Sequence, residues 1–280
     1  IAPMVNVPVR QALLKAGFPA TTLSMTVDRA CCSSMTALEC ACRGIQAGEI
    51  EIAIAAGAEN LSNVPHLIQG MRWGKKMGDW NVLDVNAGFN YPGFGPVSVD
   101  TDNVAAEYDI SREEMDAYSL RSQQRAVAAI DAGKFKDEII PITVHGKKGD
   151  VTYDTDEYPR RDASLEKLAK LKPTFKEDGR VTAGNASGMN DAASGVILMS
   201  EEKAKEVEAP ILARIVSVAT TGVRPEVMGI GPISASQKAL MKAGLTIDDI
   251  DLFEINEAFA AQCIACAKTL RIDEDKLNVN

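Results

Sequence analysis

Histidine, aromatic residues and positive charge are all scarce in this sequence of 280 residues. It contains two histidines and 5% aromatic residues, and its 39 acidic residues outnumber 30 basic ones, which gives a formal net charge of −9. Because broad nucleic-acid binding needs an extended basic surface, this charge argues against a nucleic-acid partner. It does not exclude an anionic small molecule, since a local basic patch is enough to bind one.

Long apolar runs and a secretory leader are also lacking. No stretch approaches the roughly 18 consecutive apolar residues of a membrane-spanning helix, so we expect no membrane partner. No charged segment followed by an apolar one marks a secretory signal at the start, and we therefore expect a cytoplasmic protein. With 46% hydrophobic residues, the chain can bury a core in one large or two small domains.

The six cysteines occur in three close pairs, which are Cys31 with Cys32, Cys40 with Cys42, and Cys263 with Cys266. Adjacent cysteines cannot bridge to each other without strain. The last pair has the spacing of a metal or redox motif, but no second such pair with zinc spacing exists. It lies in an alanine-rich helical stretch, so we predict core packing for these two thiols and no metal site.

Strand and helix patterns alternate near the start of the chain. Apolar and polar residues alternate over residues 23–27, which predicts a strand, and apolar residues recur every three to four positions over 33–47, which predicts a helix ended by Gly48. Residues 50–56 are mostly apolar, as expected for a strand in a buried parallel sheet. Residues 8–17 read as a further short helix closed by Gly17.

The middle of the chain is irregular, and the alternation returns after Ala192. Within the irregular part, Ser111 and Glu114 have the spacing of a capping box for a helix that ends at Gly133, and Arg121 to Arg125 would form its solvated face. Strand patterns cover residues 139–144, 196–199, 211–218 and 250–255, and a helix covers 234–243. The whole pattern favours a layered α/β fold.

Cys31 stands where the first predicted strand meets a helix. The N-terminus of a helix carries unpaired N–H groups and a partial positive charge, which favour a thiolate and could stabilise an oxyanion. Cys31 and Cys32 could equally be small buried residues, which is the usual fate of free cysteine. Position alone leaves the two interpretations open.

Two further segments could contribute to a site. Residues 184–191 are small and include two glycines, so a ligand could approach their backbone closely, although an ordinary tight turn explains them as well. Asn256 opens the sequence Asn-Glu-Ala-Phe-Ala after a predicted strand, where its carboxamide could hold a water or a carbonyl oxygen. Read alone, a helix cap is the better interpretation of Asn256.

Basic residues cluster locally in the irregular part of this acidic chain, and a nucleotide phosphate would fit one or two of them. They are Arg72, Lys75, Lys76, Lys147, Lys148, Arg160, Arg161, Lys167, Lys170 and Lys172. Neither His66 nor His145 lies in a segment that suggests a general base. A cysteine nucleophile usually needs one, so this scarcity weakens the enzyme interpretation of the residues alone.

Six segments in register nevertheless make the chain resemble the thiolase family, over essentially its whole length. These segments are residues 27–31, 57–62, 162–173, 181–188, 228–232 and 256–260. The resemblance implies a five-layered α/β/α/β/α core of two similar halves with an inserted loop domain. It implies an N-terminal half at residues 1–62 and 191–212, the inserted domain at 63–190, and a C-terminal half at 213–280.

The resemblance also implies roles for individual residues. Cys31 corresponds to the acylated nucleophile, and Asn256 to the residue that holds the water of an oxyanion hole. The positions that correspond to the coenzyme A tunnel and the acyl end are Arg160, Ala183, Ser187, Gly188, Met228 and Phe259. Coenzyme A thioesters are then substrates, with no permanently bound cofactor and no metal, and the protein is expected to be a homodimer or homotetramer.

The sequence departs from the family pattern at several places. The family usually has Gly-Ser-Gly after its cysteine, where this chain has Cys32, Ser33 and Ser34, a pattern similar to the β-ketoacyl synthases. A His-Met pair of some short-chain members is replaced here by Pro96 and Val97. The family also has strands ahead of the segment that starts at Ile1, and it continues after Asn-Val-Asn into Gly-His-Pro and Cys-Gly-Gly-Gly-like motifs, which we expect the intact protein to carry.

The resemblance therefore predicts an acyl-CoA C-acyltransferase that forms an acyl-cysteine. It would catalyse the Claisen condensation of acetyl-CoA or the thiolytic cleavage of a 3-ketoacyl-CoA, as in fatty acid metabolism. Two alternatives remain at this point. One is a condensing enzyme similar to the β-ketoacyl synthases, which takes acyl carrier protein, and the other is a non-catalytic relative that binds acyl-CoA.

Overall fold

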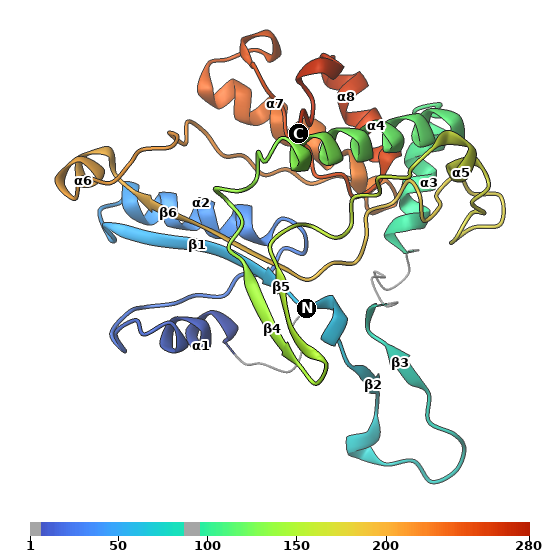
Figure 1. Cartoon of the computed structure of the whole chain (residues 1–280), viewed down its shortest axis with the longest axis horizontal. Helices are drawn as coiled ribbons and strands as arrows, with labels where there is room; N and C mark the ends of the chain where they lie inside the picture. The colour runs from blue at the N-terminus through green and yellow to red at the C-terminus, as the bar shows by residue number, and fades with distance from the viewer. Residues whose placement is uncertain (1–6, 87–95) are drawn as a thin grey trace. The chain divides into compact units, whose positions relative to one another are not determined.

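A computed structural model describes residues 7–86 and 96–280 (Figure 1). These residues divide into two compact units, which we describe separately. The first unit comprises residues 7–86 together with Met189–Val218, and the second comprises residues 96–188 together with Ala219–Asn280. Each unit thus combines segments that lie far apart in the sequence.

The first unit is built on a long antiparallel ribbon of two strands, β1 (Ile52–Glu59) and β6 (Ala192–Met199). Their register pairs Ile52 with Met199 and Glu59 with Ala192. Helix α2 (Ser33–Gln46) packs along this ribbon (Figure 1). The remaining elements are α1 (Pro8–Lys15), η1 (Leu61–Asn63), η2 (Met71–Trp73), α6 (Glu201–Glu206) and the antiparallel pair β2 (His66–Ile68) and β3 (Val82–Asp84).

The start of α2 lies very close to the ribbon because β1 has a glycine at the point of contact. A Cβ atom added at Gly57 would stand 1.9 Å from Ser34 Oγ and 3.2 Å from Ser34 Cβ. Glycine is therefore the residue that lets the first helical turn approach the strand. The predicted helix over 33–47 is confirmed, and Gly48 follows its end in the left-handed region with φ of 71°.

Three strand expectations for this unit are wrong. Residues 23–27 and 211–218 form no strand, because no partner strand lies beside them within the described residues; the Leu23 and Leu212 side chains are 89% and 95% exposed. The strand predicted at 50–56 does form as β1, but it pairs antiparallel to β6 rather than in a parallel sheet. A ribbon of two strands leaves much apolar surface exposed, as at Ile54 (48%) and Val196 (51%).

The second unit is mainly helical. Its elements are α3 (Val97–Glu107), α4 (Arg112–Asp131), β4 (Ile142–Gly146), β5 (Gly149–Tyr153), α5 (Leu165–Ala169), η4 (Pro225–Ile230), α7 (Gly231–Ala243), η5 (Ile247–Asp249), α8 (Ala260–Leu270) and η6 (Glu274–Lys276). Helix α4 runs beside α8, which also contacts α3, α7 and η4 (Figure 1). Strands β4 and β5 form an antiparallel hairpin that contains His145.

Helix α8 forms the centre of this unit's core. Nine of its eleven residues are buried, and Cys263 and Cys266 are both fully buried and free. Burial raises the pKa of Cys263 to about 12 and that of Cys266 to about 11, because an apolar environment disfavours the thiolate. The prediction that these thiols are packing residues is confirmed, since small side chains let neighbouring helices approach α8 closely.

Helix α4 begins as the sequence predicts, but its basic face is not solvated. The Ser111 hydroxyl oxygen accepts a hydrogen bond from the Glu114 backbone N–H (3.1 Å), while the Glu114 carboxylate pairs with Lys268 of α8 (2.5 Å). Arg121 pairs with Glu274, and Arg125 Nη1 donates to the Leu277 carbonyl (2.6 Å). The solvated-face prediction is wrong because Arg121 reaches a carboxylate, and Arg125 reaches backbone carbonyls, in the segment that follows α8.

The predicted strand at residues 250–255 is also wrong. Within the second unit, Phe253 makes only an isolated bridge to Leu277, with Phe253 N–H donating to the Lys276 carbonyl (2.8 Å). The 3₁₀ turn η5 occupies the preceding residues. An isolated bridge does not make a strand, since a strand needs a ladder of such bonds. The pattern over 139–144 gives a strand that begins later, at Ile142.

Candidate active site

Cys31 lies immediately before helix α2, as the position of the predicted helix requires. The helix begins at Ser33, Cys32 is its N-cap residue, and Cys31 is exposed. The residue before it, Ala30, has φ of 47°, a left-handed conformation that is uncommon for a residue other than glycine. The backbone is thus sharply turned just ahead of the cysteine.

Side chains on both sides hold this turn. Asp28 Oδ1 accepts a hydrogen bond from the Ala30 N–H (2.9 Å). Ser33 Oγ accepts one from the Arg29 N–H (2.8 Å) and donates one to the Ala30 carbonyl (2.6 Å). Such local bonds can offset the cost of the left-handed residue, which is on the order of 1 kcal/mol.

The turn stands at the positive end of a helix dipole. A side chain at the N-terminus of a helix of 14 residues experiences the positive end of its dipole. The N–H groups of Cys32 and Ser33 already donate to the carbonyls of Arg29 (3.1 Å) and Ala30 (3.0 Å). These two N–H groups are therefore engaged in the turn.

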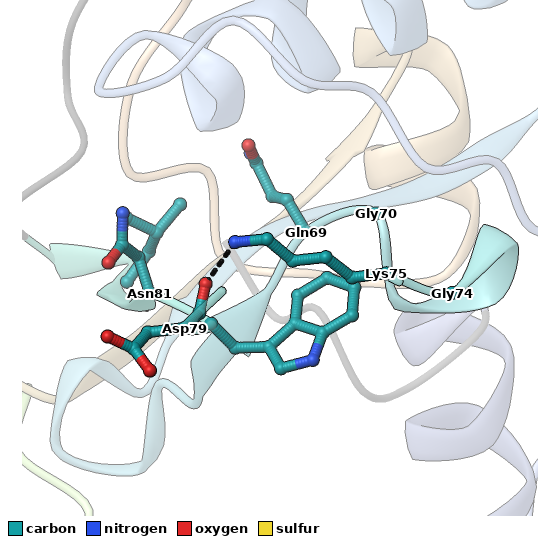
Figure 2. Close-up of a pocket in the computed structure, with 8 residues that line it drawn as sticks. Gln69, Gly70, Gly74, Lys75, Asp79 and Asn81 are labelled. Atoms are coloured by element: carbon teal, nitrogen blue, oxygen red, sulfur yellow. Dashed lines mark hydrogen bonds between the residues drawn. The ribbon is translucent and has the colours of Figure 1, made fainter. Parts of the chain in front are cut away.

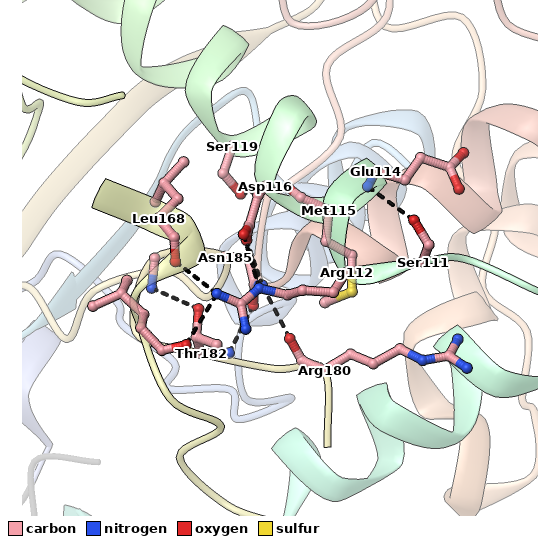
Figure 3. Close-up of polar contacts among 12 residues, drawn as sticks. Ser111, Arg112, Glu114, Met115, Asp116, Ser119, Leu168, Arg180, Thr182 and Asn185 are labelled. Atoms are coloured by element: carbon pink, nitrogen blue, oxygen red, sulfur yellow. Dashed lines mark hydrogen bonds and ion pairs between the residues drawn. The ribbon is translucent and has the colours of Figure 1, made fainter. Parts of the chain in front are cut away.

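In the second unit, the small-residue loop is held by a buried amide. Asn185 Oδ1 accepts a hydrogen bond from the Thr182 N–H (2.8 Å), and Asn185 Nδ2 donates to the Arg180 carbonyl and to Asp116 Oδ1 (both 3.1 Å), as Figure 3 shows. Asn185 is 3% exposed, and its contacts form a closed turn. The loop is thus a turn with a fixed shape, built around an asparagine.

Asp116 connects this loop to helix α4. Its carboxylate accepts two hydrogen bonds from Arg112 Nε (2.9 and 2.8 Å), and Arg112 Nη2 donates to the Leu168 carbonyl (2.6 Å) (Figure 3). Asp116 is only 4% exposed, so its pairing with Arg112 offsets the cost of burying a carboxylate. No local pattern of residues indicates this network, because its members are spread over more than 70 residues.

The loop and the Asn-Glu-Ala-Phe-Ala segment lie against each other. The Ser187 N–H donates to the Ala258 carbonyl (3.0 Å), Ala186 and Phe259 form an antiparallel bridge, and the Ala260 N–H donates to the Asn185 carbonyl (2.9 Å). Within the second unit, the structure therefore brings together candidate positions that lie about 70 residues apart. They are Ala183 and Ser187, both exposed, Gly188, half-buried, and Asn256 and Phe259.

Asn256 is exposed and does not cap a helix. Helix α8 begins at Ala260, and its N-cap residue is Phe259. The cap interpretation of Asn256 is therefore wrong, because three residues separate it from the helix start. Its backbone carbonyl accepts a weak hydrogen bond from the Cys263 thiol (3.5 Å), whereas no hydrogen bond to its side-chain amide occurs among the described residues.

The sequence interpretation missed two residues that lie beside Asn256, namely Glu257 and Asn278. Glu257 accepts hydrogen bonds from Tyr118, Ser122 and Asn278, and the Asn278 side chain also bonds the backbone of Ile255. The only indication of Glu257 in the sequence was that it directly follows Asn256. Asn278 stands in an Asn-Val-Asn run without a pattern of its own.

Two candidate positions lie apart from this contact. Met228 is 37% exposed on η4, which packs against α3 and α8. Arg160 is exposed, and its backbone N–H donates to Gln123 Oε1 (2.7 Å). Its neighbour Arg161 is bound in an ion pair with Asp131 (2.7 Å), so of these two adjacent arginines Arg160 is the one whose guanidinium has no ion pair within the second unit's described residues.

One hollow in the first unit contains none of the residues assigned to catalysis or to the coenzyme A tunnel. It has a volume of about 400 Å³ and lies in the loop between β2 and β3 (Figure 2). Lys75 Nζ donates to the Asp79 carbonyl and lies 5.8 Å from the centroid of the Trp80 ring. The contacts that Figure 2 shows thus account for Lys75, one of the local basic residues, without a ligand.

No helix within residues 7–86 or 96–280 is both long and apolar enough to cross a membrane. In the same ranges, no three His, Cys, Asp or Glu side chains are arranged to hold a metal ion. His145 lies on the exposed hairpin, where Nδ1 is 2.9 Å from Asp150 Oδ2.

Comparison with known proteins gives matches over nearly the whole chain. The thiolase N-terminal domain matches residues 4–202, and the thiolase C-terminal domain matches residues 209–280. The chain is 51% identical to an acetyl-CoA acetyltransferase of Chromobacterium violaceum over 278 residues, which cover 98% of this chain and 71% of that protein.

Solved structures give the same result. The crystal structure of human mitochondrial 3-ketoacyl-CoA thiolase superimposes with a TM-score of 0.94 at 43% identity, covering 97% of this chain and 69% of that one. The same human enzyme in complex with CoA gives a TM-score of 0.92 at 42% identity, covering 97% and 68%. The fold is thus the α/β thiolase fold, and this chain, which spans about 70% of the length of these relatives, belongs to the thiolase family.

Proposed function

We propose that the protein of which this chain is part is an acyl-CoA C-acyltransferase that forms an acyl-cysteine at Cys31. The observation that carries the proposal is an exposed cysteine on a sharp, hydrogen-bonded turn at the N-terminus of a long helix, in a chain of the thiolase family. A cysteine there is accessible to a thioester and lies at the positive end of the helix dipole.

The reaction proceeds in two half-reactions. In the first, the Cys31 thiolate attacks the thioester carbonyl of an acyl-CoA, and coenzyme A leaves as a thiolate that takes up a proton. In the second, acetyl-CoA gives up its α-proton to a base of the full-length protein, the resulting enolate attacks the carbonyl of the acyl-cysteine, and Cys31 leaves as a thiolate, which gives a 3-ketoacyl-CoA. In the cleavage direction, the Cys31 thiolate attacks the 3-keto carbonyl of a 3-ketoacyl-CoA, and acetyl-CoA leaves as an enolate that takes up a proton. The thiolate of coenzyme A then displaces Cys31 from the acyl group and gives a new acyl-CoA. Splitting one transfer into two steps lowers each barrier.

Asn256 supports these steps by holding the water that bonds an oxyanion. Its exposed carboxamide, next to a rigid backbone, supports this role.

Coenzyme A is a substrate and not a permanently bound cofactor. The residues that we propose to contact coenzyme A or the acyl group are Arg160, Ala183, Ser187, Gly188, Met228 and Phe259. The contact between the 183–188 loop and Phe259 supports this grouping.

We also propose the finer architecture that the resemblance implies. It is a five-layered core of two similar halves, with residues 1–62 and 191–212 in one half, 213–280 in the other and 63–190 as an inserted loop domain. The family matches at residues 4–202 and 209–280 support a division near residue 210. Assembly as a homodimer or homotetramer belongs to the same proposal.

A non-catalytic relative that binds acyl-CoA is the main alternative. The thiolase matches in both halves favour an acyltransferase that uses coenzyme A over a synthase that uses acyl carrier protein.

The experiment is mass spectrometry of the full-length protein after incubation with acetyl-CoA. We expect one added acetyl group on the peptide that contains Cys31, and its loss in Cys31→Ala. The matched control is Cys32→Ala, which should retain the modification. An acetyl group that persists in Cys31→Ala, or an unmodified wild-type protein, would contradict the proposal.

A further inference from the structure

The segment around Asn256, residues 255–260, is bound at nearly every residue to other parts of the second unit. The Asn256 carbonyl accepts a weak bond from the Cys263 thiol (3.5 Å), and the Ala258 carbonyl accepts one from the Ser187 N–H (3.0 Å). Phe259 is bridged to Ala186. The backbone on the C-terminal side of Asn256 is therefore fixed, while the Asn256 side chain is exposed.

On the N-terminal side of Asn256, the Asn278 side chain bonds both backbone groups of Ile255, as a neighbouring strand would. Its Oδ1 accepts a hydrogen bond from the Ile255 N–H (2.8 Å), and its Nδ2 donates to the Ile255 carbonyl (2.9 Å) and to Glu257 Oε1 (3.0 Å). Both N–H groups of the amide are thus used. Asn278 itself has φ of 46°, a conformation that asparagine tolerates better than most residues.

Glu257 collects three hydrogen bonds on its carboxylate. Tyr118 Oη donates to Oε1 (2.8 Å), Ser122 Oγ donates to Oε2 (2.5 Å), and Asn278 provides the third. Hydrogen bonds to a charged acceptor are stronger than those between neutral groups. Since Tyr118 and Ser122 lie one turn apart on α4, the carboxylate is held against a rigid helix.

Helix α4 also holds the chain that carries Asn278. Arg125 Nη1 donates to the Leu277 carbonyl (2.6 Å) and to the Asn278 carbonyl (3.3 Å), and Arg125 Nη2 donates to the Glu274 carbonyl (3.2 Å). Helix α4, residues 274–278 and the 255–260 segment therefore form one hydrogen-bonded assembly. The carboxamide of Asn256 extends from this assembly without a hydrogen-bonding partner of its own among the described residues.

We propose that Asn278 and Glu257 are positioning residues that set the location of the Asn256 carboxamide, and that they act on the reaction through Asn256 alone. This inference rests on the proposed function, in which that carboxamide holds the water of an oxyanion site. The physical reason is that preorganised donors stabilise an oxyanion only in the right place, and a displacement of about 1 Å can cost about 100-fold in rate.

The test is a double-mutant cycle in the full-length protein, with Asn256→Ala, Asn278→Ala and the double variant. We expect Asn278→Ala to lower kcat by about 10- to 100-fold, with KM for the acyl-CoA within about threefold. In the Asn256→Ala background, Asn278→Ala should change kcat by no more than about twofold. The matched control is Asn280→Ala, which removes an exposed contact with Lys134, the one side-chain bond of Asn280 among the described residues, and should keep wild-type kcat.

Glu257→Gln provides a second variant of the same size in case Asn278→Ala does not fold. It weakens the charge-assisted bonds from α4, and we expect kcat to fall about 5- to 20-fold, again only while Asn256 is present. Losses that multiply in the double variants, or wild-type kcat in both Asn278→Ala and Glu257→Gln, would overturn the positioning role. Acetylation of Cys31 in the wild type is measured in parallel, because its absence would instead refute the proposed function.

Discussion

Replacing Gly57 by alanine should displace the start of helix α2, on which the placement of Cys31 depends. The added Cβ would stand 1.9 Å from Ser34 Oγ, whereas real Cβ contacts are not shorter than 3.0 Å, so about 1 Å of movement is needed. Rotation of the hydroxyl relieves only part of this, because Ser34 Cβ remains at 3.2 Å. Overpacking of this kind costs about 1–3 kcal/mol of stability.

Gly57→Ala should also slow the reaction of Cys31. A shift of about 1 Å in a nucleophile can slow a reaction about 100-fold, so we expect acetylation of Cys31 by acetyl-CoA to slow by about 10- to 100-fold in Gly57→Ala. The rate is followed by mass spectrometry after rapid mixing, and stability by urea unfolding. Adding Ser34→Ala should restore most of the rate, since it removes the atom in closest contact.

The matched control is Gly195→Ala on the partner strand β6. There the new Cβ would lie 3.4 Å from Ala56 Cβ, an ordinary contact, so both rate and stability should stay near wild type. A Gly57→Ala protein that acetylates at the wild-type rate would refute the reasoning. Two results together would also refute it: Ser34→Ala fails to restore the acetylation rate of Gly57→Ala, and Gly195→Ala acetylates as slowly as Gly57→Ala.

Three further predictions follow from the second unit. Arg160→Ala should raise KM for coenzyme A thioesters about fivefold with kcat unchanged, whereas Arg161→Ala, whose guanidinium is paired, should leave steady-state kinetics unaltered. Asp116→Ala should cost about 3–5 kcal/mol in urea unfolding, because it leaves a largely buried arginine without its partner; a loss below about 1 kcal/mol would contradict this. The pKa values of Cys263 and Cys266, about 12 and about 11, exceed the ordinary 9.0, so their protonated forms stabilise the fold fully below pH 9 and this contribution is lost as pH rises towards 12. Replacing both thiols by alanine should flatten the fall in Tm between pH 9 and 11, and an unchanged slope would count against it.

Local patterns in the sequence predicted the helices well. The apolar spacing over 33–47, the Ser111 cap and the glycine after residue 243 each correspond to a helix or a helix end in the structure. Helices are determined by bonds between residues four apart, so a short window contains most of the relevant information. The same holds for the burial of Cys263 and Cys266, which follows from their place on an apolar helix.

Strand predictions failed where the partner was remote. Residues 23–27 and 250–255 have the expected alternation, yet neither has a ladder of bonds within its unit. A strand exists only when another segment supplies its hydrogen bonds, and its own residues do not specify that segment. The antiparallel pairing of β1 with β6, more than 130 residues away, could not be read from either strand alone.

The sequence by itself determined the family, the position of Cys31 before a helix and the candidate segments around residues 184 and 256. Only the tertiary structure decided that these two segments touch, that Asn256 is free of any helix cap, and that Glu257 and Asn278 hold the backbone beside it. The physical reason is that these side chains act through hydrogen bonds to groups 20 to 140 residues away. Such partners become neighbours only when helix α4 packs against α8, and no local pattern records that contact.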